Sequence, residues 1–259
     1  MRTIAVAGKG GTGKTTLAAL IVRCLSERGT KPILAVDADA NVNLNDVLGV
    51  TLKETIGNIR EEMKDRVSGL PGGMTKPQFL EYKIHASLVE TARFDLVAMG
   101  RPEGPGCYCY ANNLLRDILE TLSANYAHVV IDNEAGLEHL SRRTTQRIDD
   151  LIVVADPSPR GIRAAARISR LLKELDSRVD RRFLVLNRVR GPLPGPVSSL
   201  IREAGLDLVA SVPEDDHLLR MDQEGYSIWD VPTDSPVYLT IHRLLDDLTN
   251  DEKPREVSP

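Results

Sequence analysis

The sequence predicts an α/β fold, with a doubly wound, mainly parallel sheet of roughly seven or eight strands flanked by helices. Two observations lead to this fold class. Short β-rich apolar runs alternate with helical patterns along the 259 residues, as expected of βαβ units. A glycine-rich loop also joins the first predicted strand to the first predicted helix. We expect a single domain over residues 1–250 and a disordered polar tail at residues 251–259.

Seven strands are predicted from the apolar runs: Thr3–Ala7, Ile33–Val36, Phe94–Ala98, Val129–Asp132, Leu151–Ala155, Phe183–Asn187 and Leu208–Val212. The first helix is predicted over Lys14–Glu27, because its apolar residues recur at helical spacing and Gly29 follows it. Cys24 lies on this apolar stripe and is therefore assigned to the core. Further helices are predicted over Asn112–Ser123, Gly161–Leu175, Val197–Ala204 and Val237–Leu248.

The segment Thr51–Thr91 differs in character from the rest of the chain. It contains charge-dense helical patterns over Lys53–Val67 and Pro77–Thr91, separated by the glycine- and proline-rich residues 69–73. We interpret the segment as a helical insertion that lies over the sheet edge or the nucleotide site, and not as a separate domain.

Composition narrows the classes of function. Hydrophobic residues make up 42% of the chain and charged residues 27%, which is typical of soluble globular proteins. A net charge of -4 gives no reason to expect nucleic-acid binding. Three cysteines do not make a disulfide framework, and no apolar run approaches the ~18 residues that cross a bilayer. We expect a cytoplasmic protein with no secretory leader and no membrane partner.

The glycine-rich loop carries the strongest functional signal. Residues 8–15 fit the pattern G-x-x-x-x-G-K-[ST], whose backbone N–H groups surround phosphate oxygens at a helix N-terminus. Lys14 would bind the β- and γ-phosphates, and Thr15 would ligate Mg²⁺. The chain is therefore predicted to be a P-loop nucleoside triphosphatase that uses ATP and Mg²⁺. The residues expected to bind nucleotide here are Gly8, Lys9, Gly10, Gly11, Thr12, Gly13, Lys14, Thr15 and Thr16.

Lys9 distinguishes this loop from a generic version. The pattern G-K-G-G-x-G-K-T resembles the deviant Walker A motif of the MinD/ParA class, which includes the nitrogenase iron protein. The resemblance implies that Lys9 reaches the phosphates of a partner subunit, so that ATP is held across a homodimer. In that role Lys9 would stabilise the negative charge that develops during phosphoryl transfer.

Carboxylates follow two predicted strands. Asp37 and Asp39 stand at the end of the second strand, on the side where open α/β sheets bind ligands. The resemblance implies that Asp37 holds Mg²⁺ through water and that Asp39 orients or deprotonates the attacking water. Asp132 ends a further strand and is a candidate outer-sphere Mg²⁺ ligand, while the N–H of Gly136 could sense the γ-phosphate.

Three later residues match places where this class holds the adenine base. Asn187 lies at a predicted strand end, and Pro213 and Glu214 follow the last predicted strand.

Cys107 and Cys109 form a Cys-x-Cys motif in a glycine- and proline-rich loop at residues 100–110. Two thiolates supply half of a closed tetrahedral metal site, and a second copy of the chain could supply the rest. Four other interpretations stay open: buried packing, a local disulfide or redox pair, a monomeric site completed by histidines, and an iron–sulfur cluster shared by a dimer. A tetrahedral four-thiolate site suits Zn²⁺, whereas Ni²⁺ often prefers square-planar donors, so the ligands alone do not name the metal.

The deviant phosphate loop, the run Gly100–Cys109 and the segment Asp132–Arg142 together resemble the CooC/AcsF family of nickel-insertion ATPases. This family matures carbon-monoxide dehydrogenase and acetyl-CoA synthase. The resemblance implies ATP hydrolysis coupled to Ni²⁺ delivery, with the metal held by the Cys107 and Cys109 pairs of two chains. Two alternatives remain: an ATP-dependent reductase like the nitrogenase iron protein, and a MinD-like positioning ATPase.

Overall fold

The computed structural model describes residues 1–65, 73, 75–101, 122–135, 147–174 and 179–249. A central sheet has the strand order β3-β4-β2-β5-β1-β6-β7-β8. All neighbouring strands are parallel except β3, which runs antiparallel to β4 at one edge. The strands are β1 (Arg2–Gly8), β2 (Ile33–Ala38), β3 (Val89–Glu90), β4 (Asp95–Ala98), β5 (His128–Asn133), β6 (Ile148–Ala155), β7 (Val179–Val189) and β8 (Leu208–Pro213). The predicted doubly wound α/β class is confirmed.

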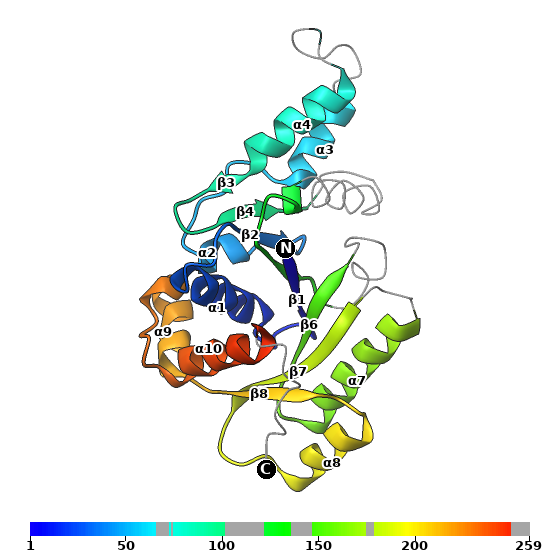
Figure 1. Cartoon of the computed structure of the whole chain (residues 1–259), viewed down its shortest axis with the longest axis vertical. Coiled ribbons are helices and arrows are strands. Elements are labelled where there is room, and N and C mark those ends of the chain that lie inside the picture. The colour runs from blue at the N-terminus through cyan, green and yellow to red at the C-terminus, as the bar shows by residue number, and fades with distance from the viewer. Residues whose placement is uncertain (66–72, 74, 102–121, 136–146, 175–178, 250–259) are drawn as a thin grey trace.

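Helices cover both faces of the sheet (Figure 1). One face packs against α1 and α10, and the other against α7 and α8. The helices are α1 (Lys14–Glu27), α2 (Leu44–Val47), α3 (Ile56–Asp65), α4 (Lys76–Ser87), α7 (Pro159–Glu174), α8 (Gly195–Glu203), α9 (Asp216–Glu224) and α10 (Pro236–Thr249), with a 3₁₀ turn η2 at Ile228–Asp230. Among the described residues, no helix has the length and apolar character needed to span a membrane.

Strand β1 shows why the sheet is buried on both faces. Ile4 and Val6 belong to the core under α1, whereas Ala5 and Ala7 belong to the core on the opposite face. Alternate residues of a strand point to opposite faces, so a central parallel strand must be apolar at every position. This explains the continuous apolar runs of the sequence.

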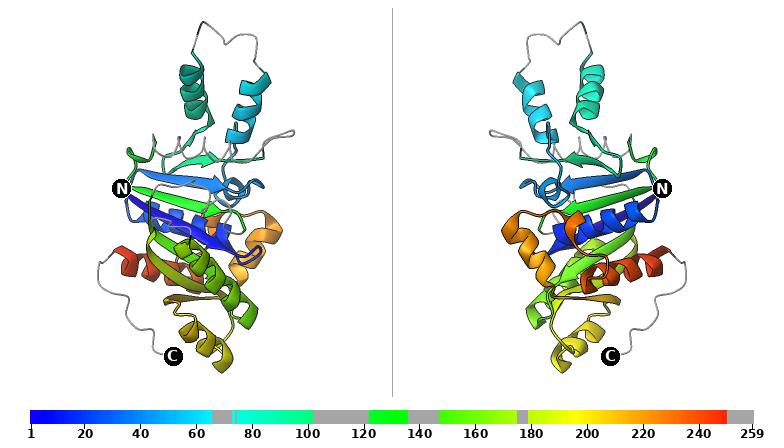
Figure 2. Two further views of the ribbon diagram at one scale, coloured as in Figure 1. Left: turned by 90° about the vertical axis from the view of Figure 1, so that its right-hand side faces the viewer. Right: turned by 90° about the vertical axis from the view of Figure 1, so that its left-hand side faces the viewer.

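The insertion at residues 51–91 projects away from the sheet. Helices α3 and α4 extend beyond the β3–β4 edge, as the views in Figure 1 and Figure 2 agree. Lys83 of α4 holds the base of this hairpin through ion pairs with Glu54 and with Glu62 of α3. The insertion therefore starts and ends at the sheet edge but does not lie flat over it.

Four short elements were absent from the sequence-based prediction: β3, α2, α9 and the turn η2. The two-residue strand β3 pairs with β4 and replaces the end of the predicted helix Pro77–Thr91, because α4 ends at Ser87. Most of the predicted helix Asn112–Ser123 and the tail at 251–259 lie outside the described residues.

Candidate nucleotide-binding site

The phosphate loop lies between β1 and α1, at the carboxyl edge of the parallel strands. Helix α1 begins at Lys14, and its cap residue Gly13 has the left-handed φ of 87°. The first turn of α1 contains no acidic residue. The positive end of the helix dipole and its free N–H groups are thus available to an anion.

At two positions of the loop, neighbouring atoms leave little room for a side chain. A Cβ on Gly8 would lie 2.3 Å from the carbonyl oxygen of Val154 in β6. A Cβ on Gly13 would lie 2.3 Å from the side-chain amide nitrogen of Asn187. A larger residue in place of Gly8 would collide with the backbone of β6, and one in place of Gly13 would displace the side chain of Asn187.

Within the loop, the carbonyl oxygen of Lys9 accepts two side-chain hydrogen bonds. The hydroxyl of Thr12 donates to it at 2.9 Å, and the ammonium group of Lys14 at 3.5 Å. Lys14 is buried, whereas the side chain of Lys9 is exposed. The side chain of Lys14 is therefore held within its own loop, whereas that of Lys9 is accessible to solvent; the role of Lys9 across a dimer stays a prediction.

A residue of strand β7 also holds the phosphate loop in place. The side-chain amide of the buried Asn187 donates to the carbonyl oxygen of Thr12 at 2.8 Å. Its side-chain oxygen accepts the backbone N–H of Arg188 at 3.0 Å. Asn187 is thus a brace of the phosphate loop, and its predicted contact with adenine stays a prediction.

Arg188 is a site residue that the sequence analysis missed. It has a left-handed φ of 58°, and its guanidinium donates to the carbonyl oxygen of Gly11 at 3.3 Å. Positive φ is uncommon for a residue other than glycine and often marks a functional site. The only indication of this role in the sequence was a basic residue directly after Asn187, the last residue of a predicted strand.

The predicted carboxylates lie together at the ends of β2 and β5. Asp37 and Asp132 are direct partners in the register of these adjacent strands, and both are buried. Asp37 accepts the backbone N–H groups of Asp39 at 3.0 Å, Asn43 at 2.9 Å and Leu44 at 2.9 Å. It therefore holds the segment after β2 in place. Strand β2 extends to Ala38, so the buried Asp37 lies within the strand and the half-buried Asp39 lies just beyond its end.

Asp132 has the surroundings of a cation ligand. The pKa of its carboxyl is raised to about 7, chiefly by burial, against a hydrogen bond from Thr15; the charges of Asp37 and Asp39 also raise it, and the charge of Lys14 lowers it. One of its carboxylate oxygens, Oδ1, is buried with no hydrogen-bond partner among the described residues. Burial likewise raises the pKa of Asp37.

These oxygen donors fit Mg²⁺, a hard cation that binds carboxylates, hydroxyls and water. Thr15 would ligate the ion, with Asp132 and Asp37 in its outer sphere. The bound ion would neutralise charge on the phosphates of a nucleotide.

The predicted adenine contacts at the end of β8 differ in exposure: Pro213 is half-buried and Glu214 is exposed. Val189 of β7 pairs with Pro213, so the ends of these strands are adjacent. Glu214 is exposed and forms a bidentate ion pair with Arg190, which lowers the pKa of the Glu214 carboxyl. Arg190 was not predicted.

Three predicted site residues, Gly136, Cys107 and Cys109, lie outside the described residues. In the part of the chain that the structure describes, no cluster of three or more His, Cys, Asp or Glu side chains is arranged to hold a metal ion.

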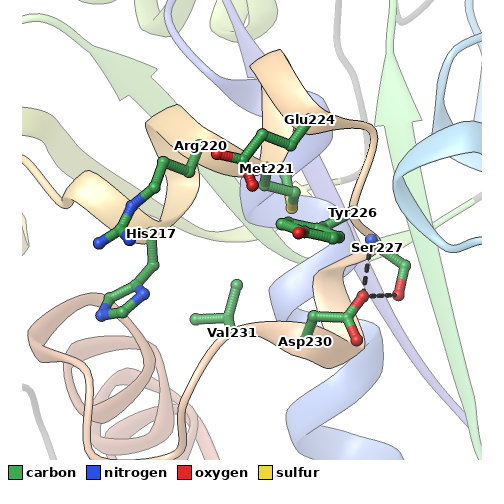
Figure 3. Close-up of a pocket in the computed structure, with 8 residues that line it drawn as sticks. All are labelled: His217, Arg220, Met221, Glu224, Tyr226, Ser227, Asp230 and Val231. Carbon is green, nitrogen blue, oxygen red and sulfur yellow. Dashed lines mark hydrogen bonds between the residues drawn. The ribbon is translucent and has the colours of Figure 1, made fainter.

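A separate cavity of about 390 Å³ lies between α9 and η2 (Figure 3). His217 and Arg220 lie on one side of it, and Tyr226 and Asp230 on the other. The carboxylate of Asp230 is already bonded to the N–H and hydroxyl of Ser227, both at 2.9 Å. None of the predicted site residues lines this cavity.

Comparison with known proteins agrees with this geometry. Residues 3–228 match the CobQ/CobB/MinD/ParA nucleotide binding domain. The chain is 44% identical to an uncharacterized ATP-binding protein of Methanocaldococcus jannaschii, over 95% of this chain and 98% of that protein. It is 29% identical to the carbon monoxide dehydrogenase accessory protein CooC of Rhodospirillum rubrum, over 88% of this chain and 89% of that protein.

Among solved structures, the septum site-determining protein MinD of Pyrococcus horikoshii, complexed with Mg-ADP, has the same fold. The TM-score is 0.68 at 21% identity, over 96% of each chain. The family match covers most of the chain and includes the phosphate loop and both Asp37 and Asp132. The chain therefore belongs to the CobQ/CobB/MinD/ParA family of nucleotide-binding domains.

Proposed function

We propose that this protein is an ATP-hydrolysing metallochaperone that binds Ni²⁺ between two subunits and inserts it into carbon-monoxide dehydrogenase or acetyl-CoA synthase. The observation that carries the proposal is the combination of the exposed Lys9 in the phosphate loop with Cys107 and Cys109 in one short motif. The similarity to CooC over most of both chains supports it.

The residues of the nucleotide site have separate roles in ATP hydrolysis. Lys14 and the N–H groups at the start of α1 bind the phosphates of ATP, and Thr15 with Asp132 and Asp37 accommodates Mg²⁺. Asp39, which is half-buried beside this cluster, orients or deprotonates the attacking water. Lys9 of each subunit stabilises the charge on the γ-phosphate bound by its partner.

The nucleotide controls the distance between the two thiol pairs. ATP closes the homodimer through Lys9 and brings both copies of Cys107 and Cys109 together. Four thiolates then surround one ion, which can be Ni²⁺ or, by its preference for tetrahedral sulfur sites, Zn²⁺. Hydrolysis opens the dimer and releases the ion to the client enzyme.

Metal analysis of the purified protein tests the proposal. We expect about one Ni²⁺ per two chains, as a four-thiolate site requires. The combined substitution Cys107→Ser and Cys109→Ser should abolish binding, whereas Cys24→Ser is the matched control and should retain it. Undiminished binding by the double variant would refute the shared site.

The chain is also 28% identical to the septum site-determining protein MinD of Bacillus subtilis, over 87% of this chain and 80% of that protein, which favours a second candidate, a MinD-like positioning ATPase at a membrane surface. Co-sedimentation with liposomes in the presence of ATP would support this candidate. A third, the iron–sulfur reductase, requires a visible chromophore with bound iron and sulfide. A colourless protein that stays in the supernatant would leave the nickel proposal as the better account.

A further inference from the structure

Helix α7 carries four arginines on one face. Arg160, Arg163, Arg167 and Arg170 follow one another at spacings of three, four and three residues, and all are exposed. Residues three and four apart are neighbours on a helix surface, so the four side chains form a single row. The opposite face of α7 packs into the core through Ile162, Ala165, Ile168 and Leu172.

Nothing in the described part of the chain neutralises this arginine row. None of its four members forms an ion pair with a described residue, whereas arginines in or next to strands β6 and β7 do. Arg147 pairs with Asp180 at 2.7 Å, and Arg181 pairs with the buried Asp150 at 2.6 Å. Like charges at helical spacing repel one another, and exposed helices usually interleave acidic residues between basic ones. The row is therefore a surface that an acidic partner would stabilise.

The arginine row is connected to the nucleotide site by its place in the fold. Helix α7 follows β6, whose Val154 is the register partner of Gly8 at the start of the phosphate loop. The row begins with Arg160 at this edge and extends about 15 Å along the helix axis. Leu171, which is 37% exposed, adds an apolar contact beside the far end of the row. Figure 1 shows α7 on the outside of the sheet, beside β6 and β7.

We propose that the arginine row of α7 is the docking surface for an acidic surface of a protein partner. Arginine pairs with carboxylates in a bidentate manner and is enriched at protein interfaces, where lysine is depleted. The chain as a whole is acidic, with a net charge of -4 and a pI of about 5.8, whereas nucleic-acid-binding domains are usually basic overall, so we choose a protein partner over a nucleic acid. The partner is the client enzyme that the proposed function requires, and in this respect the inference rests on that function.

The first test uses a probe that is independent of the client. A fluorescein-labelled, glutamate-rich helical peptide is titrated with the full chain at low ionic strength, and its anisotropy is recorded. We expect Arg163→Glu with Arg167→Glu to weaken binding at least about tenfold. The control, Arg220→Glu with Arg243→Glu, makes the same change in charge on α9 and α10 and should bind as the wild type does.

A larger loss of peptide binding in the α7 variant than in the control variant supports the arginine row as the docking surface. Equal binding by the two variants, or a larger loss in the control, overturns it. Short duplex DNA and vesicles that contain phosphatidylglycerol are titrated in parallel. If either binds more tightly than the peptide and loses binding in the α7 variant, the assignment to a protein partner is wrong. The rate of ATP hydrolysis should be the same in the wild type and both variants, because α7 contributes no residue to the nucleotide site.

The second test uses nickel-free carbon-monoxide dehydrogenase in a pull-down with the ATP-bound protein. Arg163→Lys with Arg167→Lys keeps the charge but removes the bidentate geometry, and we expect binding between that of the wild type and that of the glutamate variant. The peptide could distinguish the variants while the wild type fails to bind the enzyme. In that case the arginine row remains supported as a docking surface, and the proposed client is wrong. If the enzyme binds both charge-reversed variants equally, the docking surface lies elsewhere.

Discussion

Asn187 and Thr12 lie 175 residues apart in the chain, yet the side-chain amide of Asn187 donates a hydrogen bond to the carbonyl oxygen of Thr12 at 2.8 Å. This bond joins the end of β7 to the phosphate loop. A loop of four glycines would otherwise be free to adopt many conformations. The arrangement predicts that part of the affinity for nucleotide comes from a residue that lies far from the motif in the sequence.

Asn187→Ala should weaken the binding of ATP. Loss of one hydrogen bond corresponds to about 1 kcal/mol, or roughly fivefold in Kd. Calorimetric titration with Mg-ATP measures the effect, and Asn125→Ala in an exposed turn is the control. Tripolyphosphate, which has no base, separates the two roles of Asn187. If Asn187 holds the loop in place, the substitution should weaken the binding of ATP and of tripolyphosphate equally. If Asn187 contacts adenine, the substitution should weaken the binding of ATP alone.

Lys9→Ala should leave the fold and the binding of ATP to one subunit intact, because the side chain of Lys9 is exposed and Lys14 remains. Dimerisation induced by a non-hydrolysable ATP analogue should be lost. Turnover should fall by a factor on the order of 10²–10³, the usual effect of removing one group that stabilises the transition state. Light scattering gives the mass, and Lys53→Ala, an exposed lysine elsewhere, is the control. Normal hydrolysis by a monomeric Lys9→Ala variant would contradict the role across the interface.

Cys24 should be inert in the native protein. Its thiol is fully buried, and burial raises its pKa to about 12, with a further contribution from the charge of Glu27. The thiolate is the reactive form, so the thiol should not react with a disulfide reagent at pH 8. A variant with Cys107→Ser and Cys109→Ser isolates this residue: we expect no label in the native state and one label after denaturation. Rapid labelling of the native variant would show that α1 opens.

His128 should make the stability of the protein fall in mild acid. Burial lowers its pKa from 6.5, and the charges of Arg2 and the N-terminal amine lower it further. The folded state therefore keeps His128 neutral while the unfolded chain takes up a proton below about pH 6.5. This contribution to the free energy of unfolding is complete above that pH and is lost as the pH falls. One such group can change the free energy of unfolding by at most about 1.4 kcal/mol per pH unit.

Urea denaturation between pH 5 and pH 8 measures this dependence. His128→Gln should reduce the slope, whereas His217→Gln, which changes an exposed histidine, should leave it unchanged. An identical slope in His128→Gln and the wild type would assign the acid sensitivity to other groups.

Local patterns were sufficient to predict much of the fold. The apolar spacing of α1 gave its bounds, Lys14 and Glu27, because a helix that packs on a sheet must repeat its buried face every three to four residues. The seven predicted strands all exist, since apolar runs of this length are buried in a parallel sheet. The phosphate loop could also be predicted, because its motif consists of glycines, a lysine and a threonine at fixed spacing within eight residues. The short strand β3 could not be predicted, because two residues carry no periodicity.

The sequence by itself determined the α/β class, the phosphate loop and the acidic residues that follow two of the strands. The tertiary structure alone decided that Asp37 faces Asp132 across adjacent strands, that Asn187 and Arg188 brace the loop, and that the insertion projects outward from the sheet edge. The physical reason is the range of the interactions. Periodicity and turn chemistry act within a few residues, whereas strand order and side-chain contacts join segments that only the folded chain brings together.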